Sequence, residues 1–115
     1  MVDNCLFCKI IKGEIPAKIV DNTKHALAFR DINPKAPTHI LIIPKEHIAS
    51  CRDLNEENIH YLSEIAFMAQ KIADKEKITE GGYRWVLNTG DAGGQTVDHI
   101  HLHLLGGRNM TWPPG

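Results

Sequence analysis

Three histidines occupy alternate positions of the segment HIHLHLL, residues 99–105, near the end of the chain. Side chains in a β-strand alternate between its two faces, so His99, His101 and His103 would share one face and the aliphatic residues between them the other. Neighbouring imidazoles would lie about 6 to 7 Å apart, near enough to act on one bound group. The pattern predicts a strand that presents an imidazole cluster. A half-buried strand whose solvent face carries histidine is the simpler alternative.

An imidazole can attack phosphorus when its Nδ1–H is held by an acceptor, because Nε2 then presents its lone pair. His101 is the middle residue of the three, and the backbone carbonyl of His99 is a candidate acceptor for its Nδ1–H. A protonated His103 would stabilise phosphate charge in the transition state. The spacing also leaves open a zinc site built from all three imidazoles.

A glycine-rich segment, TGDAGGQT at residues 89–96, stands directly before the histidines. Glycines allow positive φ and close backbone approach, so the N–H groups of this loop and the Thr96 hydroxyl could hold a phosphate. The spacing fits neither a Walker A loop nor a dinucleotide-binding GxGxxG motif. A plain turn is the alternative, although an anion held here would lie over His101 or His103.

Two cysteines near the N-terminus, Cys5 and Cys8, form a Cys-x-x-Cys pair. Together with histidines elsewhere they could complete a Cys₂His₂ zinc site, because thiolate and imidazole are ligands of structural zinc. A redox pair would stand in a βαβ unit, which this sequence does not suggest. Two free thiols are the alternative. The third cysteine, Cys51, is expected to be a small residue near the start of a helix.

The length of 115 residues predicts a single domain, residues 1–115. Thirteen Lys and Arg against fourteen Asp and Glu give a formal charge of −1, so neither a nucleic acid nor an anionic membrane is expected as a partner. No signal-peptide pattern and no run of about 18 apolar residues occurs. The odd number of cysteines does not suggest a disulfide framework. The expected location is cytoplasmic.

Five short segments bounded by turn residues predict strands, at residues 17–20, 25–30, 38–43, 83–88 and 99–105. One longer segment, residues 53–78, has apolar residues at three- and four-residue spacing and predicts a helix. Asp53 and Glu56 could cap this helix as a capping box, and Asn55 is an equal candidate. The short links predict an α+β domain, a five-stranded antiparallel sheet with one long helix packed on it.

The segment HIHLHLL matches the signature of the histidine triad family, and the similarity extends over nearly the whole chain, with the Hint branch resembled most. The resemblance implies a homodimer in which two sheets join into one of ten strands. It also implies hydrolysis of purine nucleoside 5′-phosphoramidates and aminoacyl-adenylate-like compounds through a nucleotidyl-histidine intermediate. A dinucleoside polyphosphate hydrolase is a second reading, against which the GGQT loop and the WPPG ending count. A non-catalytic nucleotide- or metal-binding module is a third.

The same resemblance implies a role for individual residues. His101 corresponds to the nucleophile, and His39 to a further active-site histidine that relays a proton or orients its neighbours. Around the α-phosphate and ribose it places His103, Gly94, Gln95, Thr96 and Asn88. Asp31 would bind the ribose hydroxyls with Ile32 beside it, while Phe7 and Phe29 line the base pocket.

A structural zinc ion is also implied, because a subset of the family carries the Cys-x-x-Cys pair. Its ligands would be Cys5, Cys8, His47 and His99. A closed four-coordinate zinc cannot activate water, but it can fix one end of the histidine segment. The sequence departs from eukaryotic relatives at Arg30, where those carry histidine, which leaves the preferred base open.

Overall fold

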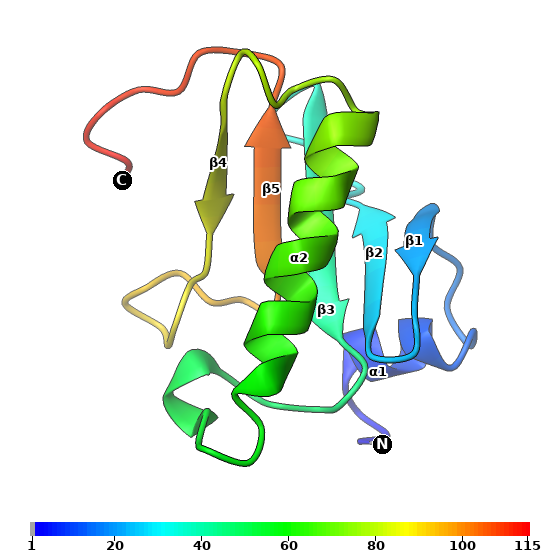
Figure 1. Ribbon diagram of the computed structural model, residues 1–115. Helices are drawn as coiled ribbons and strands as arrows, with labels where there is room; N and C mark the ends of the chain where they lie inside the picture. The colour runs from blue at the N-terminus through cyan, green and yellow to red at the C-terminus, as the bar shows by residue number, and fades with distance from the viewer. Residues whose placement is uncertain (1) are drawn as a thin grey trace.

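The protein, as a computed structural model that describes residues 2–115, has a five-stranded antiparallel sheet with the strand order β1-β2-β3-β5-β4 (Figure 1). The strands are β1 (Ile19–Asn22), β2 (Ala26–Arg30), β3 (Thr38–Pro44), β4 (Tyr83–Val86) and β5 (Leu102–Gly106). The helices are α1 (Leu6–Ile11), α2 (His60–Lys75) and a short 3₁₀ helix, η1 (Cys51–Asp53). The predicted α+β fold is confirmed, and α1 is the element that the sequence pattern did not predict.

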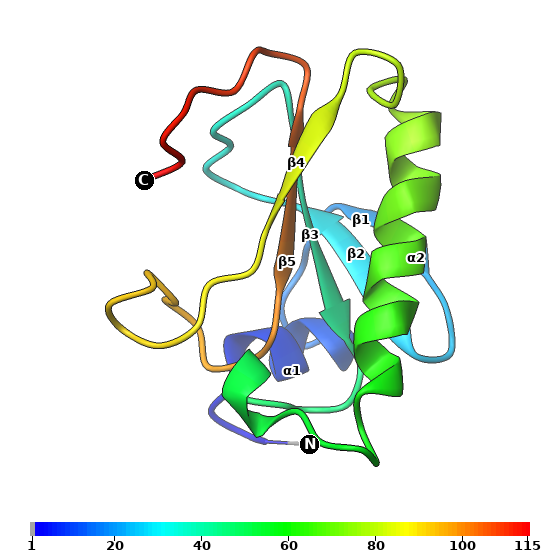
Figure 2. The ribbon, with the colours of Figure 1, turned by 60° about the vertical axis from the view of Figure 1, so that its left-hand side comes forward.

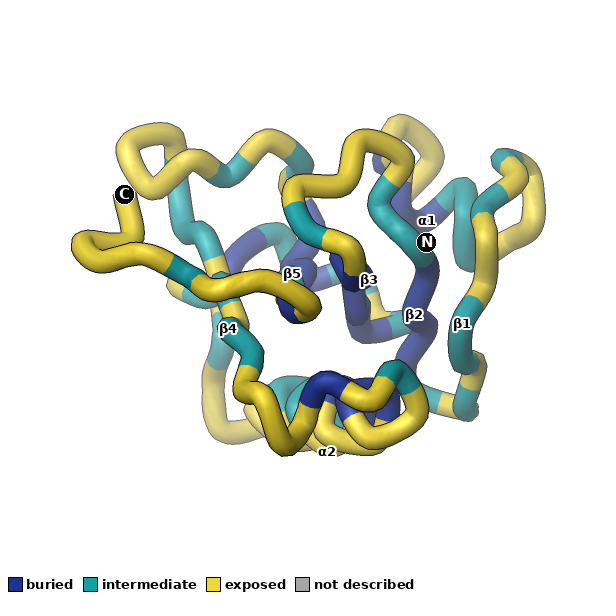
Figure 3. The backbone as a smooth tube through the Cα atoms, turned by 90° about the horizontal axis from the view of Figure 1, so that it is seen from above, coloured by how far each residue is buried: buried dark blue, intermediate teal, exposed yellow. Residues whose placement is uncertain are grey.

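Strand β3 forms the centre of the sheet, because all seven of its residues are buried and both neighbouring strands pair with it. Its Ile40 and Ile42 belong to the larger core cluster, which includes the buried face of α2. Its Leu41 and Ile43 belong to a second cluster with Phe7 of α1. Seen from above, the two helices lie on opposite sides of the buried central strands (Figure 3). The second cluster therefore lies on the α1 side of the sheet, where its Phe7 packs against His99 and His101.

Helix α2 is shorter than the helix predicted over residues 53–78. The carboxamide oxygen of Asn55 accepts hydrogen bonds from two backbone N–H groups of the preceding turn, at 2.9 and 3.0 Å. Asp53 instead accepts from the hydroxyl of Ser50 at 3.2 Å, so the capping box of Asp53 and Glu56 is not formed. The cap belongs to Asn55, and it starts a turn rather than α2 itself. No helix within residues 2–115 is long and apolar enough to cross a membrane.

The histidine segment is only partly a strand, because β5 begins after His101. The chain before β5 is held by other bonds: the His99 N–H donates to the carbonyl of Val97 over 2.9 Å, and the Ile100 N–H donates to that of Ile48 over 2.8 Å. Both His99 and Ile100 are buried, so the chain is enclosed on both sides here. The expectation that the three histidines stand together on one strand is therefore wrong.

The other four strands differ slightly from prediction: β1 begins and ends two residues later, β2 begins one residue later, β3 ends one residue later, and β4 ends at Val86 rather than at Asn88. After β4 the chain leaves the sheet as the glycine-rich loop, which stands away from α2 on the other side of the sheet (Figure 2). The loop therefore lies on the side of the sheet that carries α1 and the histidines.

Candidate active site and metal centre

The three histidines of the segment point to different neighbours. The ring of His99 lies 5.0 Å from that of His47, between ring centroids, whereas the ring of His103 lies 5.2 Å from that of His39. His101 lies between them, and its centroid is 5.1 Å from that of His103. The segment thus connects two separate imidazole groups through a central histidine.

The first group, which we call the cysteine–histidine cluster, consists of Cys5, Cys8, His47 and His99, and its ligand atoms all lie within 4.8 Å of one another. The His99 Nδ1 lies 3.4 Å from Cys5 Sγ, 3.6 Å from Cys8 Sγ and 3.2 Å from His47 Nδ1. A zinc tetrahedron with ordinary bond lengths has N···S edges of about 3.6 Å and N···N edges of about 3.3 Å. The spacing of these side chains therefore fits a tetrahedral zinc ion.

The hydrogen bonding of His99 suits a metal as well. The Nε2–H of His99 donates to the carbonyl of Pro44 over 2.9 Å, so Nδ1 keeps its lone pair. Burial lowers the pKa of His99 to about 4, which keeps the ring neutral. Cys5 is the N-cap of α1 and its Sγ accepts from the N–H of Cys8, which places both thiols on the same side. The residues predicted as zinc ligands are thus brought together.

His101 is held in the orientation that a nucleophile needs. Its Nδ1–H donates to the carbonyl of His99 over 2.7 Å, as the sequence predicted, so the Nε2 atom carries the lone pair. The ring is buried and packs edge to face on Phe7, with centroids 5.1 Å apart. In its neutral form His101 therefore has a fixed tautomer, in which Nε2 is the atom that can react.

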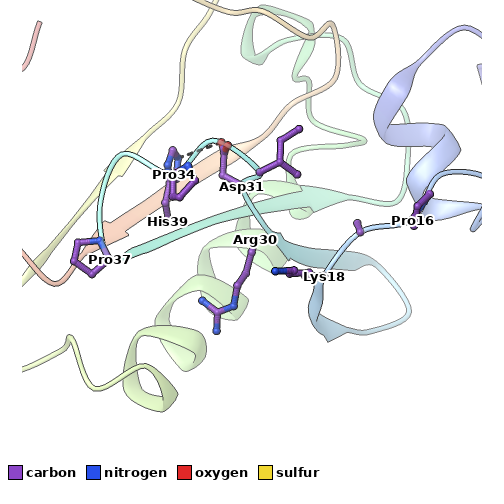
Figure 4. Close-up of a pocket in the computed structure, with 9 residues that line it drawn as sticks. Pro16, Lys18, Arg30, Asp31, Pro34, Pro37 and His39 are labelled. Carbon is purple, nitrogen blue, oxygen red and sulfur yellow. Dashed lines mark ion pairs between the residues drawn. The ribbon is translucent and has the colours of Figure 1, made fainter.

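The second group, which we call the histidine–aspartate group, consists of Asp31, His39 and His103. The Nε2 atom of His39 lies 2.9 Å from Nδ1 of His103 and 3.5 Å from a carboxylate oxygen of Asp31. Figure 4 shows His39, near the start of β3, and Asp31, just after β2, facing each other. Burial lowers the pKa of His103 to about 4, so its imidazole is neutral near pH 7. The expectation of a protonated His103 does not hold for the protein without a bound anion.

An apolar slot lies beside these histidines, with a volume of about 150 Å³. Phe7, Phe29, Asp31 and Ile32 all line it, and the two phenyl rings meet edge to face at 5.5 Å between centroids. Ile32 is fully exposed at its mouth. Phe7 also packs edge to face on His101, so one wall of the slot contacts the central histidine. The predicted base and ribose residues are therefore adjacent to the histidines.

The slot continues into a larger hollow of about 570 Å³, which shares Asp31, Ile32 and Arg30 with it (Figure 4). The guanidinium of Arg30, however, turns toward α2, where it forms two hydrogen bonds of 3.0 Å to Glu76. These bonds raise the pKa of Arg30 and lower that of Glu76. Arg30 therefore ties β2 to the end of α2, and its guanidinium is held by Glu76 although the residue also lines the slot.

The glycine-rich loop is folded around the side chain of Gln95. The amide oxygen of Gln95 accepts from the N–H of Gly90 at 3.0 Å, and its amide nitrogen donates to the carbonyls of Ala49 and Val97 at 2.6 and 3.0 Å. The Gln95 side chain therefore positions the loop, and its predicted place near the phosphate stays a prediction.

Three further predicted residues lie on the same loop. Gly94 has a φ of +85° and lies close to the side chain of Asn88, so the loop brings these two residues together. Thr96 is exposed and lines a surface hollow with Cys5 and His47. The loop therefore offers backbone N–H groups, an amide and a hydroxyl from one compact turn.

Two groups at the site were missed by the sequence reasoning because they are backbone groups. The carbonyl of Pro44 holds His99, and the N–H of Lys35 donates to Nδ1 of His39 over 3.0 Å. Every residue offers a carbonyl and nearly every residue an N–H, so residue type carries no signal for either contact.

Comparison with known proteins agrees with this arrangement. A sequence model of the family described as "Scavenger mRNA decapping enzyme C-term binding" matches residues 4–112. The crystal structure of a HIT family hydrolase from Legionella pneumophila Philadelphia 1 has a TM-score of 0.95 and 60% identity, over 97% of this chain and all of that chain. The chain belongs to the histidine triad family.

Two curated histidine triad relatives bear on the site. The purine nucleoside phosphoramidase of Escherichia coli K12 is 50% identical over 110 residues, which is 96% of this chain and 92% of that protein. The 14 kDa zinc-binding protein of Zea mays is 51% identical over 112 residues, which is 96% of this chain and 87% of that protein. The chain is thus homologous both to a phosphoramidase and to a zinc-binding protein.

Proposed function

We propose that this histidine triad protein hydrolyses purine nucleoside 5′-phosphoramidates and aminoacyl-adenylate-like compounds to a nucleoside monophosphate. The observation that carries the proposal is the His101 imidazole, whose Nδ1–H is fixed by the carbonyl of His99 while Nε2 is left with its lone pair. The homologous phosphoramidase of Escherichia coli supports the same class of reaction.

The reaction has two steps. Nε2 of His101 forms a bond to the α-phosphorus, the P–N bond breaks, and the amine leaves with the bonding electrons and takes up one proton from solvent. The nucleotidyl-imidazole carries a positive charge, which the carbonyl of His99 stabilises through Nδ1–H. Water then attacks phosphorus, the bond to Nε2 breaks with its electrons returning to the ring, and water releases the proton that balances the first step.

The substrate would be held by the slot and the loop. The aromatic slot takes a flat apolar base, and Asp31 lies where a carboxylate can accept from the ribose hydroxyls with Ile32 beside it. Gly94, Thr96 and Asn88 provide donors for phosphate oxygens from the glycine-rich loop. His103 completes the site next to the nucleophile.

The cysteine–histidine cluster would hold a structural zinc ion. Bound zinc would supply a cross-link among α1, the segment after β3 and the residues before β5, since all four positions are taken by Cys5, Cys8, His47 and His99. This cross-link fixes His99, whose carbonyl in turn orients His101. The four ligand residues would thus affect the reaction only through the position of His101.

The protein would act as a homodimer joined through β4. This strand is at one edge of the sheet, and its Trp85 is 43% exposed. Trp112 in the C-terminal segment is 81% exposed, which is unusual for so large an apolar ring. Pairing of two β4 edges would form the ten-stranded sheet.

Replacing the nucleophile tests the proposed reaction. We expect His101→Ala to reduce kcat/KM on adenosine 5′-phosphoramidate at least about a thousandfold, because no other group can form the covalent intermediate. His25→Ala is the matched control, since His25 packs near Tyr61 outside the site and its loss should leave the rate unchanged.

The substrate class is tested by the same assay. Faster turnover of a diadenosine polyphosphate than of the phosphoramidate would favour the dinucleoside polyphosphate hydrolase reading. Undiminished turnover in His101→Ala would contradict the mechanism, and binding of AMP with no turnover of either substrate would leave a nucleotide-binding module.

A further inference from the structure

The proton of His39 is placed by a backbone amide. The Lys35 N–H lies 3.0 Å from Nδ1 of His39 and can only donate, so Nδ1 must be the unprotonated nitrogen. The ring is 6% exposed, and burial lowers its pKa, which favours the neutral form. A neutral His39 therefore carries its single proton on Nε2.

The proton position of His39 also determines that of His103. The Nε2–H of His39 has an acceptor in Nδ1 of His103 at 2.9 Å, closer than the carboxylate oxygen of Asp31 at 3.5 Å. Because Nδ1 of His103 accepts, a neutral His103 carries its proton on Nε2. Through His39, the amide of Lys35 thus decides which nitrogen of His103 is the hydrogen-bond donor.

This arrangement does not suit a proton relay or a metal ion. His39 could give up its proton only by becoming an imidazolate, since its other nitrogen carries none. A metal on Nε2 would require that proton to move to Nδ1, where it would face the N–H of Lys35. The histidine–aspartate group therefore orients a donor, although its three side chains lie close enough together to be ligands.

The Lys35 amide is itself held firmly. Its segment begins at Asp31, whose carboxylate accepts from the N–H of Asn33 at 2.8 Å. The side chain of Arg108 donates from Nε to the carbonyl of Lys35 over 2.9 Å. Pro37 at the other end lies so close to Gly107 that a Cβ there would be 2.9 Å from it. The segment between β2 and β3 is thus tied to the chain after β5.

We propose that the Lys35 backbone amide is a positioning group which, through His39, holds His103 as a neutral Nε2–H donor to a non-bridging phosphoryl oxygen. This inference rests on the proposed function for the identity of the acceptor, but the proton positions do not depend on any substrate. A preorganised donor of this kind stabilises charge that develops on the phosphoryl group and needs no proton transfer.

The proton positions can be measured directly by nitrogen NMR of the zinc-loaded full chain, with ring signals assigned by loss in His39→Gln and His103→Gln. We expect Nδ1 unprotonated and Nε2 protonated in both rings at pH 7.5. A His103 ring that is charged or protonated on Nδ1 would overturn the inference. The measurement needs no substrate, so it can succeed or fail independently of the phosphoramidase reaction.

The functional part is tested by removing the amide proton. Lys35→Pro lacks the N–H, and we expect kcat on adenosine 5′-phosphoramidate to fall about 10- to 100-fold with KM within twofold. Lys35→Ala keeps the N–H and is the matched control, with kcat unchanged. Equal kcat values in the two variants would overturn the role of the amide.

A second pair of variants keeps the test valid if Lys35→Pro does not fold. Glutamine in place of His39 offers an N–H near the position of Nε2, whereas asparagine offers only a group near Nδ1. We expect His39→Gln to keep kcat within about threefold and His39→Asn to lose tenfold or more. If His39 relays a proton, both variants should lose activity equally, and the inference would be wrong.

Discussion

The cysteine–histidine cluster and the histidine–aspartate group contain imidazole pairs at similar separations, yet they are suited to different chemistry. In the first, Nδ1 of His99 lies 3.2 Å from Nδ1 of His47, and in the second, Nε2 of His39 lies 2.9 Å from Nδ1 of His103. The difference lies in the group behind the ring. A carbonyl, that of Pro44, accepts from His99, whereas an N–H, that of Lys35, donates to His39.

An imidazole backed by a carbonyl presents a lone pair, and one backed by an N–H presents a proton. His101 follows the first rule, because the carbonyl of His99 accepts from its Nδ1–H. The backbone group that faces each ring therefore decides whether that imidazole offers a lone pair, as His99 and His101 do, or a proton, as His39 does.

The largest expected effect is the loss of zinc and of stability when a ligand of the cysteine–histidine cluster, but not a residue of the histidine–aspartate group, is replaced. We expect Cys8→Ser to lose the zinc ion and to lower the free energy of unfolding by roughly 3 to 5 kcal/mol, since a buried ligand of a folded-state site is removed. Elemental analysis and urea denaturation measure both quantities. His103→Gln is the comparison, and it should keep one zinc per chain. Release of zinc by that variant would show that the histidine segment binds metal as one site.

A smaller effect follows from the burial of His103. Its pKa is lowered from 6.5 to about 4, so below pH 6.5 the unfolded chain takes up a proton that the folded state resists. The free energy of unfolding should therefore fall as the pH drops from 6.5 to about 4, by up to about 3 kcal/mol from this residue. Above pH 7 the ring is neutral in both states and contributes nothing to this dependence.

Urea denaturation of wild type and His103→Gln, both zinc-loaded, at pH 7.5 and pH 4.5 isolates this contribution, because the other titrating groups are common to both. The wild type should lose more stability than the variant on acidification. Equal losses would mean that His103 is not held neutral by the fold.

The smallest expected effect is that of a second metal ion, because we expect the histidine–aspartate group not to bind one. Adding a tenfold excess of Co²⁺ to the zinc-loaded protein should shift the unfolding free energy by less than about 1 kcal/mol, because His39 is protonated on the nitrogen that faces the group. The d–d absorption of Co²⁺ reports binding directly. A new band that disappears in His39→Gln would show a metal site there and would remove the contrast between the two groups.

Side-chain pattern predicted the architecture and most of the site. The alternation and turn residues indicated the five strands, and His101 was predicted with its acceptor, the carbonyl of His99. The short helix α1 was missed because six residues give too little periodicity. The split of the histidines could be expected only from the resemblance, since His39 on β3 and His47 just after it are distant in sequence from the histidines that they contact.

The neutral form of His103 and the use of the Gln95 side chain in holding the loop could not be predicted, for a common reason. Both depend on what surrounds the side chain: burial in one case, and the carbonyls of Ala49 and Val97 in the other. Residue type tells which protonation states and hydrogen bonds a side chain can have, and the local packing decides which of them it adopts.

The carbonyl of Pro44 and the amide of Lys35 have a consequence for how such a protein can change over time. Substituting a side chain does not delete a main-chain group, so at these positions selection acts on the path of the backbone rather than on the identity of the residue. Lys35 could be replaced by almost any amino acid except proline without loss of its contact to His39. Sequence variability at position 35 would therefore say little about how much the reaction depends on it.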